Sequence, residues 1–283
     1  MRQCNIGMAA LLGLALLPVG GGAAQAKATP WISVEMAQIR MLSAQAAVAG
    51  RNTLDLGFQI RLEAGWKTYW RSPGAAGIPL RVSWTGSENV ARAELRWPAP
   101  KRFSQGGIDS FGYADEVVLP IRIEIAQLDA GLRLRAQVSY AVCREICVPL
   151  EAKLALDLPA KTGGETADRA SEFHRRLIER FQARIPGDSG LEIEGAKLLV
   201  SKPVVLAVTV RSPVPLKNPD LIVEGPPDYA FGRPTFERLP ANRGILRLPI
   251  EPDLGAPPYA GGRLTLTLID DPRALEKSLS VGQ

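Results

Sequence analysis

The sequence predicts an all-β protein in which two β-sandwich domains are joined by one amphipathic helix. Three observations support this fold class. Apolar residues alternate with period two along much of 31–158, a helical period replaces the alternation at 170–185, and the alternation returns from residue 204 onwards. Segments rich in glycine and proline separate the short alternating runs, as is typical of sandwiches.

The N-terminal segment has the pattern of a secretory signal peptide. Arg2 precedes an apolar run at 8–17, and small residues follow at Ala24 and Ala26. We expect cleavage after Ala26 and export to an oxidising compartment. The apolar run is too short to span a bilayer, and no later stretch approaches the roughly 20 apolar residues of a membrane helix.

The chain that remains after cleavage is long enough for two domains. We expect a first domain over 27–160, a connecting helix within 161–187 and a second domain over 188–283. No internal run of charge or low complexity suggests a further linker.

Alternating runs at 54–62, 80–84 and 117–125 predict strands of the first domain, as do the two runs that flank its cysteines. Turn-forming residues at 72–77 and 85–89 separate these runs. All five tryptophans fall in this domain, and we expect burial in the core to account for most of them.

A change of period predicts the connecting helix. Its apolar residues recur at helical spacing: Ala170, Phe173, Leu177, Phe181 and Ile185. Thr162 and Glu165 can form a capping box at its start, although Thr166 is an equally good cap, and Pro186 with Gly187 ends it.

The second half of the chain carries alternating runs at 204–210, 221–223, 245–250 and 264–268, which predict a second sandwich. It contains neither cysteine nor tryptophan. The sequence therefore indicates no chemical site in this domain.

Charge and histidine content exclude several functional classes. The formal charge of +5 falls by one when Arg2 is removed, and lysine and arginine form no block that would follow a phosphate backbone. We therefore expect no nucleic-acid partner. His174 is the only histidine, which excludes most histidine-based hydrolases and zinc sites, and we expect it on the surface of the helix.

Two cysteines, Cys143 and Cys147, lie four residues apart between two alternating runs. Four extended steps would separate their Cα atoms by roughly 13 Å, whereas a disulfide needs about 4.4 to 6.8 Å. A hairpin with the three-residue loop 144–146 brings them opposite each other and permits a disulfide. Both cysteines fall on the polar parity of their strands, so we expect both sulfurs to face outward.

Such a disulfide is either a structural staple or a redox site. Closing so short a loop removes only about 2 kcal/mol of unfolded-chain entropy. The outward parity favours redox chemistry. Arg144 favours a thiolate and Glu145 opposes it, so the local charge does not decide between the two.

A glycine-rich loop at 103–116 carries Phe103, Phe111 and Tyr113. It can fold over a reactive disulfide and shield it. It can equally form a hairpin whose aromatic side chains lie in the core.

The residues around the cysteines form a motif of the type YxxC, a short insert, then CxPxE: Tyr140, Cys143, Cys147, Pro149 and Glu151. Together with the segments 65–74, 97–103 and 111–120, this motif resembles the N-terminal periplasmic domain of the DsbD thiol:disulfide interchange family. The resemblance covers 31–159. A second β domain is also present in the periplasmic region of the related ScsB proteins.

The resemblance implies immunoglobulin-like sandwiches and a periplasmic location. It implies that Cys143 and Cys147 exchange disulfides, receiving electrons from a membrane partner and passing them to oxidised periplasmic proteins of the thioredoxin-like or disulfide-containing kind. The loop with Phe111 and Tyr113 corresponds to the family's protective cap, and Tyr140 to a site-shaping residue. We expect no metal and no cofactor.

Two departures from the family matter. The cysteines are closer together than in the best-known DsbD proteins. The sequence also has no transmembrane electron-carrying segment and no thioredoxin-like CxxC motif, so we expect a stand-alone soluble chain that a separate membrane protein must recharge.

Two other functions stay open. The chain is alternatively a binding module for a periplasmic protein or peptide, with a disulfide that only closes a hairpin. A copper-handling protein is a further alternative, because two thiolates can bind Cu(I), although Met36 and Met41 are far from the cysteines in sequence.

Overall fold

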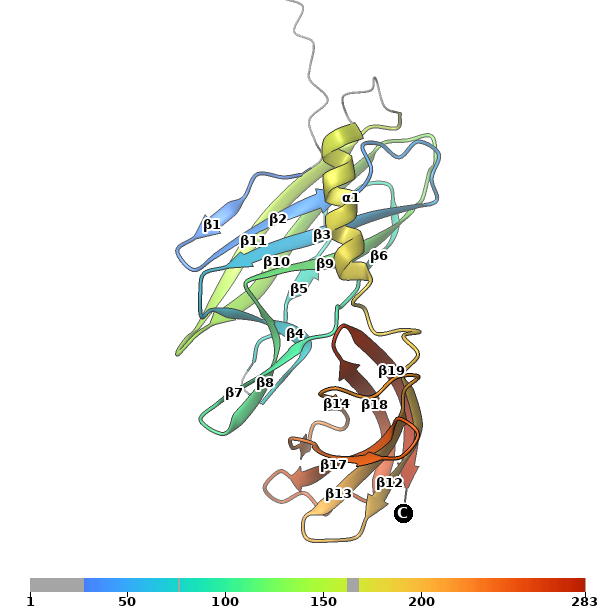
Figure 1. Ribbon diagram of the computed structural model, residues 1–283. Helices are drawn as coiled ribbons and strands as arrows, with labels where there is room; N and C mark the ends of the chain where they lie inside the picture. The colour runs from blue at the N-terminus through green and yellow to red at the C-terminus, as the bar shows by residue number, and fades with distance from the viewer. Residues whose placement is uncertain (1–27, 76, 162–167, 283) are drawn as a thin grey trace, which may run out of the picture.

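A computed structural model describes residues 28–75, 77–161 and 168–282, and the predicted signal peptide and helix-capping residues lie outside these ranges. The chain forms two β-sandwiches, and one helix lies against the first of them (Figure 1). The predicted fold class, two immunoglobulin-like sandwiches with one helix, is confirmed. The domain boundaries at 160 and 188 stay predictions.

The first sandwich has two sheets, with strand orders β1-β2-β3-β9-β6 and β11-β10-β4-β8-β7, and β5 pairs with β10. The first sheet contains β1 (Ile32–Val34), β2 (Ala37–Ser43), β3 (Thr53–Leu62), β9 (Glu116–Ile125) and β6 (Val90–Leu95). The second contains β11 (Cys147–Leu158), β10 (Leu132–Cys143), β4 (Lys67–Gly74), β8 (Ile108–Ala114), β7 (Lys101–Gln105) and β5 (Arg81–Ser83).

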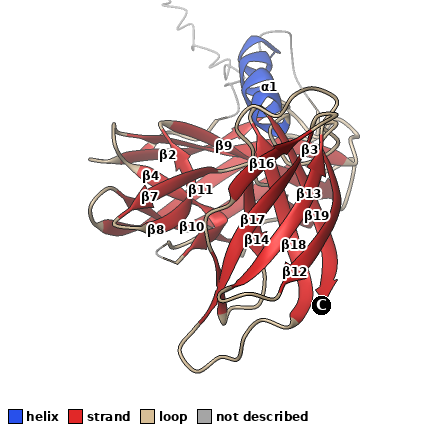
Figure 2. Ribbon diagram, turned by 60° about the horizontal axis from the view of Figure 1, so that its bottom comes forward, coloured by secondary structure: helices blue, strands red, loops and turns tan. Residues whose placement is uncertain are grey.

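The second sandwich also has two sheets, one ordered β12-β13-β17-β15 with β16 beside β17, the other ordered β14-β18-β19. Figure 2 shows these strands with the bottom of the Figure 1 view turned forward. The first sheet contains β12 (Glu192–Leu199), β13 (Val204–Arg211), β17 (Arg243–Pro252), β15 (Tyr229–Phe231) and β16 (Thr235–Leu239). The second contains β14 (Asp220–Glu224), β18 (Gly261–Asp270) and β19 (Arg273–Gly282).

Strand alternation accounts for the core of the first sandwich. Along β11, Ala152, Leu154, Leu156 and Leu158 are buried, and the residues between them are exposed. Successive side chains of a strand point to opposite faces, so one face of β11 packs into the core and the other meets solvent. The predicted runs of the first domain are therefore strands for the reason expected.

The turn predicted at 72–77 is partly wrong, because β4 continues to Gly74. At this point Gly74 pairs with Ser110 of β8, and a Cβ atom on Gly74 would lie 2.6 Å from the carbonyl oxygen of Asp109. A glycine is needed there for close approach of the two backbones, and it extends the strand instead of ending it.

The helix α1 (Asp168–Gln182) packs on β2, β3 and β9. Its buried face contains His174, Leu177, Ile178 and Phe181, which form one stripe at helical spacing. The predicted placement of Phe173 on this face is wrong, because the Phe173 side chain is 58% exposed. The helix also ends before Ile185. No helix among the described residues is long and apolar enough to cross a membrane.

The predicted surface position of His174 is also wrong, since this residue is only 5% exposed. Burial, together with the positive charge of Arg40, lowers the pKa of His174. The imidazole is therefore neutral at pH 7 and packs as a flat, mostly apolar ring between helix and sheet.

The tryptophans mostly follow the prediction of core packing. Trp70 is fully buried, and Trp66, Trp84 and Trp97 are partly buried and pack against the same core. Trp31 instead lies beneath the guanidinium groups of two arginines.

Candidate redox site

The two cysteines lie at the tip of the β10–β11 hairpin. Cys143 pairs directly with Cys147, the loop between them has three residues, and their Cα atoms are 4.1 Å apart. The sulfur atoms form a disulfide. The structure therefore confirms the hairpin and the pairing that chain reach and strand parity predict.

The two sulfurs are not equally accessible. Cys147 is exposed, as predicted, but Cys143 is only 2% exposed, so the prediction that both face outward is wrong for Cys143. The reason is tertiary: the start of β4 pairs with the end of β10, with Thr68 opposite Val142 and Lys67 opposite Cys143. The outer face of the hairpin is thereby covered at its tip.

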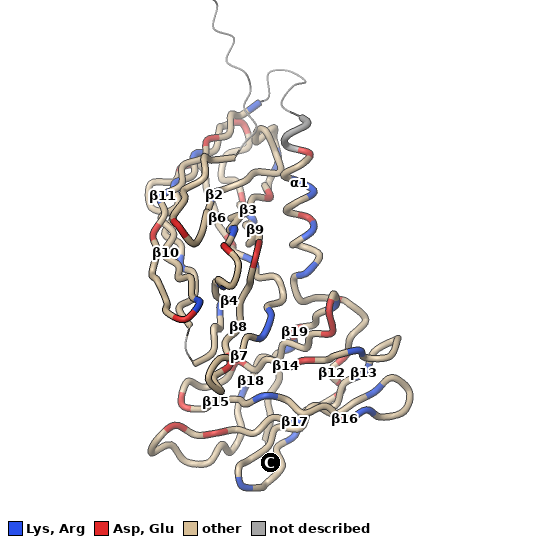
Figure 3. The backbone as a smooth tube through the Cα atoms, turned by 60° about the vertical axis from the view of Figure 1, so that its left-hand side comes forward, with Lys and Arg blue, Asp and Glu red and all other residues tan. Residues whose placement is uncertain are grey.

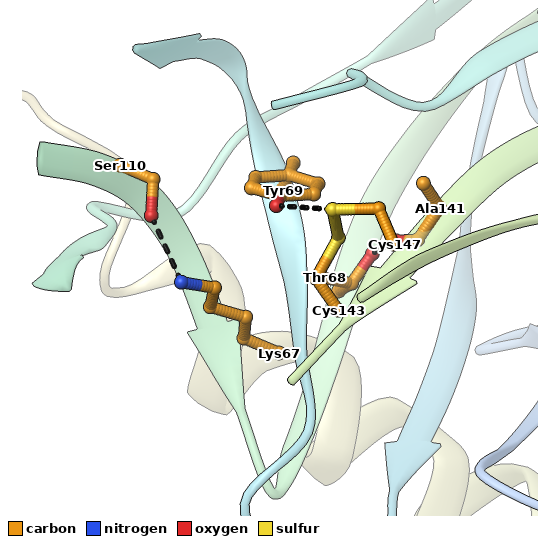
Figure 4. The surroundings of a disulfide bond; sticks show 7 residues. All are labelled: Lys67, Thr68, Tyr69, Ser110, Ala141, Cys143 and Cys147. Carbon is orange, nitrogen blue, oxygen red and sulfur yellow. Dashed lines mark hydrogen bonds between the residues drawn. A yellow bond between two sulfur atoms is a disulfide. The ribbon is translucent and has the colours of Figure 1, made fainter. Parts of the chain in front are cut away.

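Tyr69 of β4 supplies this cover. It forms a small buried cluster with Ala141 and Cys143, and its hydroxyl lies 3.3 Å from the Cys147 sulfur (Figure 4). A disulfide sulfur carries no hydrogen, so the tyrosine donates and the sulfur accepts. Burial raises the pKa of Tyr69, so the hydroxyl keeps its proton at neutral pH.

Two close backbone approaches hold Tyr69 in this place. Gly112 of β8 pairs with Tyr69, and a Cβ atom on Gly112 would lie 2.0 Å from the carbonyl oxygen of Thr68. On another side of the ring, a Cβ atom on Gly77 would lie 2.7 Å from Tyr69 Cδ1. The Thr68 hydroxyl donates to the Ala141 carbonyl at 2.9 Å and fixes β4 to β10.

Two basic side chains lie near the hairpin tip. The Lys67 amine donates to the Ser110 hydroxyl at 3.2 Å (Figure 4). The same amine lies 5.5 Å from the centre of the Phe103 ring. Burial lowers the pKa of Lys67. Arg144, in the loop between the cysteines, has its guanidinium 5.5 Å from the Trp66 ring. Positive charge at this tip favours a thiolate once the disulfide is opened.

The structure places the three predicted cap or site-shaping residues in the core. Residues 101–114 form the β7–β8 hairpin, so the hairpin alternative applies and not the covering loop. Phe111, Tyr113 and Tyr140 are at most 8% exposed and belong to the core of the first sandwich. The Tyr113 hydroxyl donates to the Pro98 carbonyl at 2.7 Å.

Sequence reasoning missed Tyr69, the side chain that contacts the exposed sulfur. A signal was present: in the segment 66–71, Trp66, Thr68 and Trp70 share one parity, and Lys67 and Tyr69 share the other. That alternation predicts a strand with a second, polar face. Only the pairing of β4 with β10 shows that this face meets the cysteines.

The second sandwich and the whole chain resemble known proteins to different degrees. Residues 184–283 match a domain of unknown function (DUF8393), and no curated protein matches the chain. The crystal structure of the N-terminal periplasmic domain of ScsB from Proteus mirabilis is similar in fold, with a TM-score of 0.72 and 24% identity over 92% of this chain and 100% of that chain. The crystal structure of the periplasmic chaperone SfaE matches with a TM-score of only 0.21 and 14% identity, over 86% of this chain and 100% of that chain.

The first sandwich has a family assignment of its own. Residues 38–159 match the family described as thiol:disulfide interchange protein DsbD, N-terminal. This range includes the hairpin with both cysteines, the strand with Tyr69 and the β7–β8 hairpin. The chain therefore carries, in its first sandwich, a domain of the DsbD N-terminal family.

Proposed function

We propose that the protein exchanges disulfides in the periplasm through reversible opening of the Cys143–Cys147 bond. One observation carries the proposal: an exposed cysteine, Cys147, is bonded to a buried one, Cys143, and its sulfur accepts a hydrogen bond from Tyr69. A sulfur that solvent reaches is open to an incoming thiolate. Membership of the first sandwich in the DsbD N-terminal family supports this chemistry.

Reduction begins at Cys147. The thiolate of a reduced partner attacks the Cys147 sulfur, a new bond joins the two proteins, and the Cys143–Cys147 bond breaks with its electron pair on Cys143. Cys143 then takes a proton from solvent. A second thiolate of the partner attacks its own sulfur in the mixed disulfide, so the partner leaves as a disulfide and Cys147 leaves as a thiolate.

Delivery to a client reverses the roles. The Cys147 thiolate attacks a client disulfide and forms a mixed disulfide, and one client sulfur leaves as a thiol after protonation. Cys143 gives up its proton, and its thiolate attacks the Cys147 sulfur of the mixed disulfide. The bond from Cys147 to the client breaks, and the second client sulfur leaves as a thiolate that takes up a proton. Two electrons pass to the client, and the chain returns to the disulfide form.

Tyr69 favours this cycle by stabilising the Cys147 thiolate. Hydrogen bonds to a charged acceptor are stronger than those to a neutral one, so the hydroxyl favours the open form more than the disulfide. Tyr69 is therefore assigned as a positioning residue, and the two cysteines as the reacting groups.

The proposed partners follow from this chemistry. A separate membrane protein supplies the electrons, because the described residues hold one cysteine pair and no second redox group. The clients are thioredoxin-like or other disulfide-containing proteins of the periplasm. The reaction needs no cofactor beyond the two sulfurs.

The reduction potential of the cysteine pair tests the proposal. Mature protein is equilibrated with glutathione or dithiothreitol buffers, and free thiols are trapped and counted by mass spectrometry. We expect a potential of about −120 to −270 mV, the range of exchange proteins. A potential below about −300 mV with slow reduction contradicts the proposal.

A binding module with a structural disulfide is the second candidate function, and the burial of Cys143 with Tyr69 and Ala141 favours it. In this case the potential is low, and Cys143→Ser with Cys147→Ser leaves partner binding intact. Copper handling receives less support, because Met41 is fully buried in the core and its sulfur is not available to the cysteines.

A further inference from the structure

Arg102 of β7 connects the two sandwiches. Its side chain is only 8% exposed. Its Nε and Nη2 atoms donate to the two carboxylate oxygens of Asp220 in β14, at 2.9 and 2.8 Å, and Nη2 also donates to the Leu221 carbonyl at 3.0 Å. The Nη1 atom donates to Asp109 of β8 at 2.7 Å, and the guanidinium lies 4.8 Å from the Phe111 ring centre. This arginine joins the β7–β8 hairpin to β14 with planar, paired geometry.

Arg71 of β4 makes a second connection. It donates to both carboxylate oxygens of Glu224 in β14, at 3.1 and 2.6 Å, and to Glu276 in β19. The guanidinium lies 4.4 Å from the Trp70 ring centre. Two carboxylates of the second sandwich therefore hold a strand of the first.

Further contacts occur at the same boundary. Arg233 donates from the second sandwich to Ser104 and Asp109 of the β7–β8 hairpin. Ile222 of β14 is 1% exposed and packs into the core of the first sandwich. Figure 3 shows basic and acidic segments of the two sandwiches close together where β7 and β8 approach β14.

The strands held in this way are those that flank the disulfide. Arg71 lies two residues beyond Tyr69 on the same strand, and Asp109 precedes Ser110, which accepts a hydrogen bond from Lys67. A continuous path of contacts therefore runs from the carboxylates of the second sandwich, through β4 and β8, to the Cys147 sulfur.

We propose that the second sandwich positions the redox site of the first. Asp220 holds β7 in place, and Glu224 with Glu276 holds β4 in place. The strand β4 in turn keeps Tyr69 against Cys147. The biological meaning of this role rests on the proposed disulfide exchange, but the coupling between the two sandwiches is measurable without it. The proposal gives a structural role to the second sandwich, in which the sequence indicates no chemical site.

The expected effect has a clear direction. If a carboxylate is replaced by an amide, the paired arginine loses its charge partner, and the strand that carries it is less firmly held. Tyr69 then packs less firmly against the disulfide. Thiols reach the sulfur more often, and the disulfide is reduced faster.

The test compares amide variants of the carboxylates in the mature protein. Asp220→Asn and the double variant Glu224→Gln with Glu276→Gln are treated with excess dithiothreitol, and the rate of opening of the disulfide is followed by thiol trapping. We expect both to be reduced about threefold faster than the wild type, or more. Asp271→Asn is the matched control, because Asp271 is 81% exposed and its ion pair, at 3.9 Å, is with Arg184 and not with an arginine of β4 or β7. Its rate is expected to stay that of the wild type.

The same substitutions in a Tyr69→Ala background show whether the effect passes through Tyr69. We expect them to leave the rate unchanged there, since the cover is already absent. The proposal is overturned if the amide variants lower the melting temperature but not the protection of the disulfide, or if their acceleration is the same without Tyr69. Arg71 is 29% exposed and Arg102 only 8%, so the variant at Glu224 and Glu276 still tests the proposal if Asp220→Asn fails to fold.

The proposed exchange function fails on a different measurement. A wild-type potential below about −300 mV contradicts exchange and leaves the rate comparison intact. An unchanged rate in the amide variants contradicts the coupling, whatever the potential of the wild type.

Discussion

The body and the tip of the β10–β11 hairpin differ in their pattern of side-chain burial, although they belong to the same two strands. Along the body, exposure alternates with every residue of β11, as period-two geometry requires. At the tip, Tyr140, Ala141, Val142 and Cys143 are all buried in succession. The alternation fails where a second strand, β4, covers the outer face.

This difference separates the two cysteines chemically. Cys147 keeps the exposure that its parity predicts, whereas Cys143 loses it to Tyr69. A symmetric, fully exposed pair would offer either sulfur to a partner. The covered tip offers mainly Cys147, in agreement with the order of steps that we propose for exchange.

Trapping of mixed disulfides gives the largest expected difference between the two cysteines. Cys143→Ala leaves the exposed Cys147 without its resolving partner, and Cys147→Ala leaves only the buried Cys143. With glutathione disulfide as the probe, we expect on the order of tenfold more glutathione adduct on Cys143→Ala after a fixed time, measured by intact mass. The double alanine variant is the control for background labelling. Equal labelling of the two single variants would show that burial does not select the attacked sulfur.

Support of the tip by β8 is tested by Gly112→Ala. The new Cβ atom would lie 2.0 Å from the Thr68 carbonyl oxygen, so β8 must move away from β4. We expect a loss of about 2 to 3 kcal/mol in the free energy of unfolding, measured by urea denaturation.

Gly195→Ala is the matched control for Gly112→Ala, because nothing lies within 4 Å of a Cβ atom placed on Gly195 in β12. Its unfolding free energy is expected to stay close to that of the wild type. Equal stability of Gly112→Ala and Gly195→Ala would mean that β4 and β8 are not closely packed at the tip.

The burial of Tyr140 at the tip of the hairpin is tested by the pH dependence of stability. Burial raises the pKa of Tyr140 to about 12, against about 10 in an unfolded chain. The unfolded state therefore releases this proton first as pH rises, and stability present below pH 10 is lost between about pH 10 and 12. The loss reaches about 1.4 kcal/mol by pH 11. Urea denaturation of Tyr140→Phe at pH 9 and pH 11 should show a smaller loss than the wild type; identical losses would contradict the burial of this hydroxyl.

Much of the body could be predicted from the sequence, because its structure depends on local alternation. The hairpin, its three-residue loop and the pairing of the cysteines follow from parity and chain reach, and the structure confirms them. The cover of Cys143 could not be predicted in this way. It depends on which distant strand pairs with the end of β10, and alternation within one segment carries no information on that pairing.

Two other errors have the same kind of cause. The apolar spacing of the helix allows Phe173 on the buried face, but the stripe that meets β2, β3 and β9 passes through His174 instead. Phe111 and Tyr113 were expected to cover the disulfide, yet the β7–β8 hairpin turns both into the core. In each case periodicity is compatible with more than one face, and tertiary packing selects among them.

The smallest expected effect concerns the hydroxyl of Tyr69. Tyr69→Phe keeps the ring over the tip and removes the hydroxyl that hydrogen-bonds to Cys147. Because that bond favours the thiolate of the open form, its loss should make the reduction potential about 10 to 30 mV more negative. Equilibration with dithiothreitol buffers measures the potential.

Tyr259→Phe is the matched control for Tyr69→Phe, since the buried Tyr259 hydroxyl has no hydrogen-bond partner among the described residues and lies in the second sandwich. Its potential should equal that of the wild type. If Tyr69→Phe also leaves the potential unchanged, the hydroxyl does not distinguish the thiolate from the disulfide. Tyr69 then acts only by covering Cys143, and the tip differs from the body only in how far solvent and thiols reach its side chains.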